Sequence, residues 1–500
     1  MYSARGKGGC GRSKSSATSP SARDVHEPPP FLSLQAPRGH QYFANFLNQG
    51  WEPQRGEKVQ VRMRFVKKPG GKRGSWHAEF FPYETMQSQF MREAEARAQG
   101  YRPTRSGSDS VVRDPRHSGS TVISESSNRS GRRLLRLPGS KFFLDLDMTI
   151  PTEPIGSIPR PQKLITAFMQ YDRGSISQGE FALICIEAVR ETIEKLEATG
   201  SPVITDGEQT KPSFATYPIH NLSNLSPDGV KIQFADGHVR QLPKLSSGPF
   251  RYKTYASTYF RTAKEIARTP VKQAVISPSA LSLLYPSEGI AGYPQEKFLS
   301  DLVNEAASEI RGCLEQGAHC VQIDFTEGRL AVKLDASGQL LSSFIALINR
   351  VLGQFSEQER KRIGIHTCPG GDRDSTHSAD VDYSGLLPSL FGLDVGNFYM
   401  QLASEPDRRR VLRIVRENLR PPRRVFVGVI NPINPKVETP QEVGDRVLEA
   451  SEFIPPELLG TTDDCGFSPF GDDLSTARET AFAKIRSRVE GTLLAAEKLR

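Results

Sequence analysis

The chain has 500 residues, of which 37% are hydrophobic and 24% are charged, a composition that predicts a folded protein with a sizeable core. It contains no run of eighteen apolar residues, which excludes a transmembrane helix, and no apolar segment near its start, which argues against secretion. Its six cysteines are too few for a disulfide framework. We therefore expect a cytoplasmic, reducing location and no membrane partner. The basic, Ser-rich first 23 residues are also compatible with an organelle transit peptide.

The positive charge is concentrated in the first 150 residues. They hold 25 Lys and Arg against 13 Asp and Glu, which leaves 40 basic and 44 acidic residues for the rest of the chain. Ser, Arg, Gly and Pro dominate 1–30, and this composition predicts disorder. The polar, Ser- and Arg-rich stretch 101–137 is expected to be a flexible linker. Arguments from charge about nucleic acid or membranes therefore concern only this first part.

One stretch within the basic part has the pattern of a β-hairpin. Val59, Val61, Met63 and Phe65 alternate with other residues, PGGK follows at 69–72, and SWHAEFFPY follows that turn. A basic hairpin with aromatic residues is compatible with nucleic-acid binding. Because no recognition signature accompanies it, we expect no nucleic-acid partner. We predict a basic extension over 1–139 and a catalytic domain over 140–500.

From about residue 150, short apolar runs alternate with amphipathic segments of helical period. Such repeated strand–helix units indicate a parallel sheet covered by helices. About 350 residues with some eight units predict an α/β fold of the (β/α)8 TIM-barrel type. A doubly wound open sheet is the alternative, although no G-x-G-x-x-G follows the first strand. The strand-like runs are at 153–157, 202–206, 272–277, 319–325, 362–368, 397–403 and 424–430, and the helical segments are at 176–199, 297–316, 339–353, 405–419, 440–451 and 471–497.

Polar residues stand where these apolar runs end. Ser157, Asp206, Ser277, Asp324 and His366 each follow or close such a run. In a barrel the carboxyl ends of the strands converge on one rim, and active sites lie there. A purely structural protein has no need for a polar group at nearly every strand end. The pattern therefore predicts an active site at this rim.

Three of the rim residues form a candidate metal site. His366 and Cys368 are two positions apart in a strand, so their side chains point to the same side. Cys465 lies near another strand end. One imidazole and two thiolates favour zinc, and three protein ligands leave a fourth position for substrate. An isolated H-x-C pair is more often a pair of buried packing residues. The prediction of a metal site therefore depends on the position of this pair at the end of a strand.

The acidic rim residues form a second constellation. Asp206, Glu208 and Asp324 follow or end predicted strands, where carboxylates can bind a substrate ammonium or act as acid–base groups. The alternative for Asp206 is a helix N-cap. For Asp324, inside QIDFTEG, a functional role is the better interpretation.

Five segments occur in an order that resembles a known family: PIGSIPRP (154–161), TDGEQ (205–209), VQID (321–324), HTC (366–368) and DDCGF (463–467). Together they look like the C-terminal catalytic barrel of cobalamin-independent methionine synthase and its single-barrel relatives, over roughly 150–500. Residues 1–140 do not resemble the family's N-terminal barrel.

The resemblance implies a zinc-bound thiolate that attacks an alkyl carbon. It implies zinc ligation by His366, Cys368 and Cys465. It also implies that the pocket for the thiol amino acid is formed by Ile155, Gly156, Ser157, Glu208 and Asp324.

Two positions depart from the family pattern. The family's synthase has a carboxylate ligand where this chain has Gln401, a neutral amide that would bind zinc weakly. The synthase also places a His after the strand that matches 424–430. Here the stretch is NPINPK (431–436), in which Asn434 could orient water but cannot act as an acid.

The leading hypothesis is a zinc-dependent thiol methyltransferase resembling 5-methyltetrahydropteroyltriglutamate–homocysteine methyltransferase, an enzyme of methionine biosynthesis. Its substrates would be a small-molecule thiol and a methyl or alkyl donor, folate-type donors included. One alternative is a zinc-dependent alkyl transferase for another thiol or electrophile, such as an epoxide. An alternative of another class is an inactive barrel with a basic RNA-binding arm, which would require the loss of the metal site.

Overall fold

The computed structural model describes residues 150–500 in full, together with the backbone of seven short strands before residue 150. The chain divides into two compact units, Met1–Ser118 and Gly119–Arg500. In the first unit, β1 (Ser33–Gln35) pairs antiparallel with β2 (Gln41–Phe43). The longer β3 (Val59–Lys67) pairs antiparallel with β4 (Gly74–Pro82), so the alternating run around Val61 lies in a strand of a hairpin.

The second unit begins with a small antiparallel sheet of β5 (Glu125–Ser127), β6 (Arg133–Arg136) and β7 (Phe143–Asp145), with β6 in the middle. The range 101–137, expected to be a linker, therefore contains two of these strands. The expected disorder of 1–30, and the rest of the expected linker 101–137, lie outside the described residues.

Eight parallel chain segments of the second unit close into a ring. Six of them form one parallel sheet, and two shorter segments complete it. Thr152 bridges Thr461, and Ile204 bridges Val271, both in parallel. The Ile158 N–H donates to the Gly207 carbonyl at 3.0 Å and links the two shorter segments. The predicted (β/α)8 barrel is thus confirmed. The sheet order is β12 (Gln273–Ile276), β13 (Val321–Asp324), β14 (Ile363–Thr367), β17 (Asn397–Met400), β18 (Arg424–Ile430) and β19 (Leu459–Asp463).

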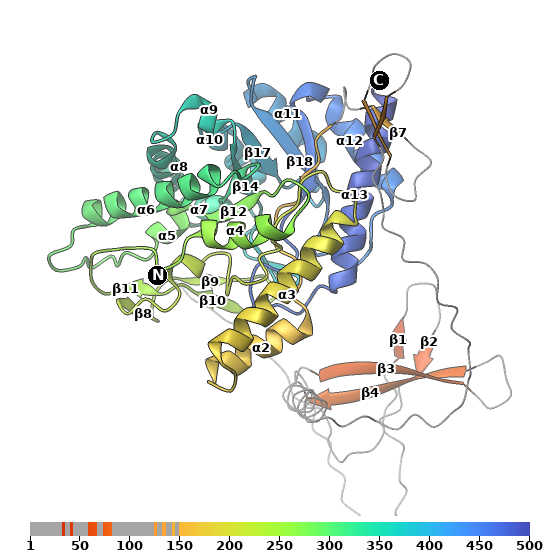
Figure 1. Ribbon diagram of the computed structural model, residues 1–500, viewed down its shortest axis with the longest axis horizontal. Coiled ribbons are helices and arrows are strands. Elements are labelled where there is room, and N and C mark those ends of the chain that lie inside the picture. Colours follow the sequence, from red (N-terminus) through yellow and green to blue (C-terminus); the bar gives the residue numbers. More distant parts are fainter. Residues whose placement is uncertain are drawn as a thin grey trace, which may run out of the picture. The chain divides into compact units, whose positions relative to one another are not determined.

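Helices cover the outside of the ring (Figure 1). Their inner faces follow the helical period: in one of them Leu341, Phe344, Ile348 and Val351 are all buried. Capping boxes fix two helix starts, one from Ser177 and one from Thr439. The helices of eight or more residues are α2 (Gln162–Asp172), α3 (Gln178–Glu197), α4 (Ala256–Ile266), α6 (Gln295–Glu315), α7 (Glu327–Leu334), α8 (Gln339–Leu352), α11 (Arg408–Asn418), α12 (Pro440–Ser451) and α13 (Arg478–Lys498). No helix in the described part of the chain is long and apolar enough to span a membrane.

Shorter elements decorate the rim and the connections. The connection from the second barrel segment to α4 carries two small antiparallel pairs, and another pair follows β14. These elements are η1 (Tyr217–Ile219), β8 (Leu225–Ser226), β9 (Lys231–Gln233), β10 (Val239–Gln241), β11 (Lys244–Leu245), α5 (Pro278–Ser282), α9 (Glu357–Arg360), β15 (Gly371–Asp372), β16 (Ser375–Thr376), η2 (Tyr383–Gly385), α10 (Leu387–Leu390) and η3 (Pro456–Leu458).

Candidate metal and thiol site

The structure brings His366, Cys368 and Cys465 together as a His-Cys-Cys cluster. His366 lies in β14, Cys368 directly follows that strand, and Cys465 follows β19 by two residues. Their ligand atoms all lie within 4.8 Å of one another, and the two sulfurs are 3.2 Å apart. His366 and Cys368 are almost fully buried. These distances and donor types suit one zinc ion with a fourth position left for a substrate.

The hydrogen bonds of His366 leave one ring nitrogen available. Its Nδ1 lies 3.2 Å from the Tyr399 carbonyl, to which an N–H at this position donates. Its Nε2 is buried and has no hydrogen-bond partner. A metal-binding histidine has this arrangement, because the outer hydrogen bond fixes the tautomer and directs the other lone pair at the metal. The donor set therefore fits a bound zinc.

The protonation of the cluster is uneven. The pKa of Cys465 lies well below its ordinary value, because the Cys368 thiol donates to its sulfur and His366 lies beside it, which together outweigh burial. The pKa of Cys368 is raised by its hydrogen bond to Cys465 and by burial. Burial lowers the pKa of His366, and the Cys465 sulfur raises it. The pKa of His366 as a result lies above its ordinary value. Thiolate character is therefore concentrated on Cys465, as a metal ligand requires.

A glycine pair after β14 supports the sulfurs. The Gly370 N–H donates to the Cys368 sulfur at 3.4 Å, and the Gly371 N–H helps to lower the pKa of Cys465. Gly370 has a left-handed φ of 70°. A Cβ there would come within 1.8 Å of His377 Nε2. Only glycine fits this turn without strain.

The residues predicted for the thiol pocket line one small cavity beside the cluster. This thiol cavity has a volume of about 20 Å³, and His366 and Cys465 form part of its wall. Glu208 on the wall accepts from the buried Lys211 ammonium at 3.0 Å, and Lys211 also donates to the Ala274 carbonyl at 2.8 Å. The predicted pocket residues on the wall are Ile155, Gly156, Ser157, Glu208 and Asp324.

The two acidic candidates beside Glu208 have different surroundings. Asp324 is buried, accepts from Gln322 Nε2 at 2.7 Å, and has a pKa raised by burial to about 7. Asp206 is not part of the cavity wall. Its carboxylate accepts from the Glu208 N–H at 3.0 Å and holds Glu208 in a left-handed conformation. Asp206 thus orients the residue that faces the substrate space.

The two positions that depart from the family pattern are both engaged elsewhere. Gln401 Oε1 accepts from Arg329 Nη1 at 3.3 Å, and its Nε2 donates to Ser404 Oγ at 2.8 Å. Asn434 is exposed, and its Oδ1 accepts from the Lys436 N–H at 3.0 Å. Among the residues of NPINPK, the structure places Asn431, Pro432 and Ile433 at the nearby cleft, and not Asn434.

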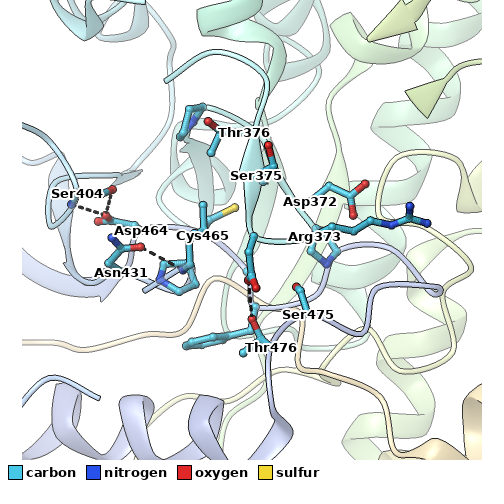
Figure 2. Close-up of a pocket in the computed structure, with 18 of the residues that line it drawn as sticks. Asp372, Arg373, Ser375, Thr376, Ser404, Asn431, Asp464, Cys465, Ser475 and Thr476 are labelled. Carbon is cyan, nitrogen blue, oxygen red and sulfur yellow. Dashed lines mark hydrogen bonds between the residues drawn. The ribbon is translucent and has the colours of Figure 1, made fainter. Parts of the chain in front are cut away.

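Two larger clefts meet the thiol cavity. The Asn431 cleft, of about 340 Å³, has Cys465, Asn431 and Asp464 in its wall. Figure 2 shows Asp372 and Arg373 on one side of Cys465, and Ser404, Asn431 and Asp464 on the other. Asp464 accepts from three backbone N–H groups, those of Leu402, Ala403 and Ser404.

The Glu327 cleft, of about 230 Å³, is lined largely by apolar residues such as Phe214, Ile276 and Leu283. Glu327 in its wall is buried; its Oε1 accepts from Ser279 Oγ at 2.5 Å, and its Oε2 has no partner. Burial raises the pKa of Glu327 to about 7. Sequence reasoning missed Glu327, Lys211 and Asp464. The run DFTEG contained a signal for Glu327 and the segment DDCGF contained one for Asp464, whereas Lys211 gave none.

Comparison with known proteins agrees with this geometry. Residues 150–489 match the family model "Cobalamin-independent synthase, Catalytic domain". A methionine synthase of Sulfurisphaera tokodaii is 25% identical over 356 residues, which cover 70% of this chain and 94% of that protein. One of Sulfolobus acidocaldarius is 24% identical over 353 residues, with 70% and 94% covered.

Solved structures with the same fold include a B12-independent methionine synthase from Shewanella sp. W3-18-1, in complex with selenomethionine. It has a TM-score of 0.56 and 17% identity, with 70% of this chain and 99% of that chain covered. A putative vitamin-B12-independent methionine synthase from Listeria monocytogenes has a TM-score of 0.52 and 21% identity, with 71% and 99% covered. The chain therefore belongs to the cobalamin-independent methionine synthase family, a family of methyltransferases, through its catalytic barrel.

Proposed function

We propose that this protein is a zinc-dependent thiol methyltransferase of the methionine-synthase type, with homocysteine or a close analogue as its thiol substrate. The observation that carries the proposal is the His-Cys-Cys cluster, whose three ligand atoms lie within 4.8 Å of one another. Two of its members also form part of the wall of the thiol cavity. Family membership supports the same conclusion.

The thiol cavity has the groups that an amino-acid thiol requires. Glu208 and Asp324 offer carboxylates for the substrate ammonium, and the Ser157 hydroxyl is a polar group on the same wall. A free thiol is mostly protonated at neutral pH, and a bound zinc would lower its pKa and keep it as the thiolate. The residues of the cavity would hold the sulfur near the cluster, so that an alkyl carbon arriving from a cleft could be attacked in line.

The donor side differs from that of a methyl-folate enzyme. Protonation of a folate leaving group needs an acid, and no histidine is among the described residues that line the Asn431 cleft. Gln401 directs its oxygen to Arg329 and adds no negative charge to the cluster. A less negative site makes a weaker nucleophile. These observations favour a second candidate, transfer from a more reactive alkyl donor than methyl-tetrahydrofolate.

The test uses the full chain loaded with zinc, with homocysteine as thiol and a panel of donors. The donors are methyl-tetrahydrofolate triglutamate, a methyl sulfonium compound and an epoxide. We expect S-alkylated homocysteine by mass spectrometry, with methyl-folate turnover below about 1 s⁻¹, the low end of ordinary enzyme rates. Cys465→Ala should abolish product, and Cys320→Ala, a buried cysteine outside the cluster, should retain it. A zinc-loaded wild-type protein that alkylates homocysteine with none of the donors would contradict the proposal.

We also propose that 140–500 is the catalytic domain and that the basic extension 1–139 is not needed for the chemistry. Every candidate site residue lies beyond residue 150. The cluster's two thiols suit a reducing, cytoplasmic compartment. A chain that starts at residue 138 should keep the activity of the full chain. If it folds and has lost that activity, the proposed boundary is wrong.

A further inference from the structure

Arg240 in β10 joins three separate loops of the rim. Its Nε and Nη2 lie 2.5 and 3.1 Å from the two carboxylate oxygens of Asp372. Its Nη1 and Nη2 also reach the two carboxylate oxygens of Asp472, at 3.0 and 2.8 Å. The guanidinium lies over the Phe470 ring, with its carbon 4.1 Å from the ring centroid. We name this set, Arg240 with Asp372, Asp472 and Phe470, the rim clamp.

Both acids of the clamp belong to loops that carry metal-ligand cysteines. Asp372 directly follows Gly370 and Gly371, whose N–H groups face the sulfurs of Cys368 and Cys465. Phe470 and Asp472 lie in the loop that follows Cys465. A short chain of contacts thus runs from Arg240 through Asp372 to the amides that support both sulfurs.

The tip of the hairpin that carries Arg240 is also attached to the loop after Cys368. The Ala235 N–H donates to the Thr376 carbonyl at 2.9 Å, and the Asp236 N–H donates to Ser375 Oγ at 3.2 Å. The hairpin of β9 and β10 is therefore held along its length, and Arg240 does not need to be ordered by the ion pairs alone. A pre-ordered guanidinium with two bidentate carboxylate partners is the strongest kind of ion pair available to a side chain.

The ion pair between Arg240 and Asp372 matters for the metal site because Asp372 is buried. The Asp372 side chain is 0% exposed, whereas that of Asp472 is 53% exposed. His238 Nε2 lies 2.9 Å from the Asp372 carboxylate and is a second hydrogen-bonding group beside it. Loss of Arg240 would leave a buried carboxylate with His238 as its neighbour. Such a carboxylate draws in water or moves toward it, and Gly370 and Gly371 would move with it.

We propose that Arg240 is a positioning residue for the metal site: the rim clamp sets the relative position of the two cysteine loops and thereby slows release of the metal. This inference rests on the proposed function, because it takes the His-Cys-Cys cluster to hold zinc. Residues that orient metal ligands from outside typically change metal affinity by about 10- to 100-fold when they are replaced.

The experiment measures zinc release from the full-length protein into excess chelator, at a temperature well below unfolding. Arg240→Ala should release zinc about 10- to 100-fold faster than wild type. Arg240→Lys keeps the positive charge but lacks the planar guanidinium, so its rate of zinc release should lie between those of wild type and Arg240→Ala. The matched control is Arg268→Ala, which breaks the Arg268–Glu197 ion pair (2.7 Å) between the C-terminal ends of α3 and α4. It should release zinc at the wild-type rate.

A second readout separates positioning from general stability. With cobalt in place of zinc, Arg240→Ala should change the thiolate-to-metal absorption bands, which report ligand geometry, and Arg268→Ala should not. Folded Arg240→Ala with wild-type release and wild-type bands would overturn the inference. If Arg240→Ala does not fold, Arg240→Lys decides, because it keeps a positive charge beside the buried Asp372 carboxylate but loses the planar guanidinium that joins the two acids. Faster release supports the inference, and unchanged release overturns it.

The two proposals can fail separately. A wild-type protein that binds no zinc would overturn both of them. A wild-type protein that binds zinc, with clamp variants that release it at the wild-type rate, would overturn only the role of Arg240.

Discussion

The barrel buries cysteines and charged groups at both ends of its interior, and the two ends use them differently. At the rim, the His-Cys-Cys cluster borders a cavity and leaves His366 Nε2 without a partner. At the opposite end, a floor cluster of Glu153, Lys272, Cys320 and Tyr399 borders none of the three spaces described above, and the Lys272 ammonium there also has no hydrogen-bond partner. Glu153 accepts from the Tyr399 hydroxyl at 2.6 Å and lies 3.5 Å from the Lys272 ammonium.

The cysteine of each cluster shows the contrast most clearly. Burial raises the pKa of Cys320 to about 12, so it remains a thiol. Cys465 is half-buried, and its neighbours lower its pKa well below the ordinary value. The Lys272 ammonium is compensated by Glu153 and by the Tyr399 ring, whose centroid is 3.9 Å away. This difference shows that burial of a polar residue does not by itself indicate a functional site. A functional site is indicated when the surroundings stabilise the reactive thiolate and leave space for a ligand beside it.

The largest expected effect is a difference in zinc content between variants of Cys465 and Cys320. Cys465→Ala should remove nearly all bound zinc, from about one equivalent per chain, because it takes away the ligand with thiolate character. Cys320→Ala, the matched change in the floor cluster, should keep the wild-type amount. Elemental analysis after dialysis against a weak chelator measures both. Zinc retained by Cys465→Ala would contradict the ligand assignment.

A change in the floor cluster should affect stability and not the metal. Lys272→Met leaves the buried Glu153 without its ammonium, and breaking such a pair costs about 3–5 kcal/mol of unfolding free energy. The double variant Glu153→Gln/Lys272→Met should recover most of this loss, because no charge is then left unpaired. Urea denaturation gives the stabilities, and elemental analysis gives the zinc content. Loss of zinc from the single variant would show that the two ends are coupled.

A buried carboxyl group that belongs to neither cluster should make the stability of the protein depend on pH. Glu309 in α6 accepts from the Tyr217 hydroxyl at 2.7 Å and the Ala256 N–H at 3.0 Å, and burial raises its pKa from 4.5 to about 7. A raised folded-state pKa gives stability that is fully present below pH 4.5 and is lost as the pH rises through about 7.

The stability of the wild-type protein should therefore fall more steeply between pH 5 and 8 than that of Glu309→Gln, which mimics the protonated group. The expected difference is of the order of 1–3 kcal/mol. Unfolding free energies from urea titrations at the two pH values provide the measurement. Equal slopes for both proteins would mean that Glu309 does not titrate in this range.

The smallest expected effect concerns Gln401. Its oxygen is held by Arg329, which also pairs with Glu405 at 2.8 Å. Gln401→Ala should leave the zinc content unchanged, in contrast to Cys465→Ala. The absorption spectrum of the cobalt form should also stay the same. A weaker or spectrally altered metal site in Gln401→Ala would identify the amide as a ligand after all.

Sequence reasoning placed the barrel and the three cluster residues, because both depend on local patterns: apolar runs, and polar residues where they end. It expected a strand end near Cys465 but gave no range for β19, whose sequence Leu459–Asp463 reads LGTTD and contains one large apolar residue. It also missed Lys211 and Arg240. Arg240 is 132 positions from Asp372 and 232 from Asp472 in the chain. Pairings over such distances are set by the closure of the ring and leave no local pattern. The orientation of Gln401 depends in the same way on Arg329, 72 positions earlier.

The thiol cavity and the two clefts meet at one glycine, and this arrangement affects how the substrates of such an enzyme can change in evolution. Of the described residues, Gly371 alone borders the thiol cavity, the Asn431 cleft and the Glu327 cleft. If the thiol binds in the cavity and the donor in a cleft, as proposed above, most cleft residues lie outside the cavity wall. Mutations at those cleft residues would then accumulate while the thiol cavity stays intact. A lineage would in this way exchange one donor for another and keep its sulfur chemistry.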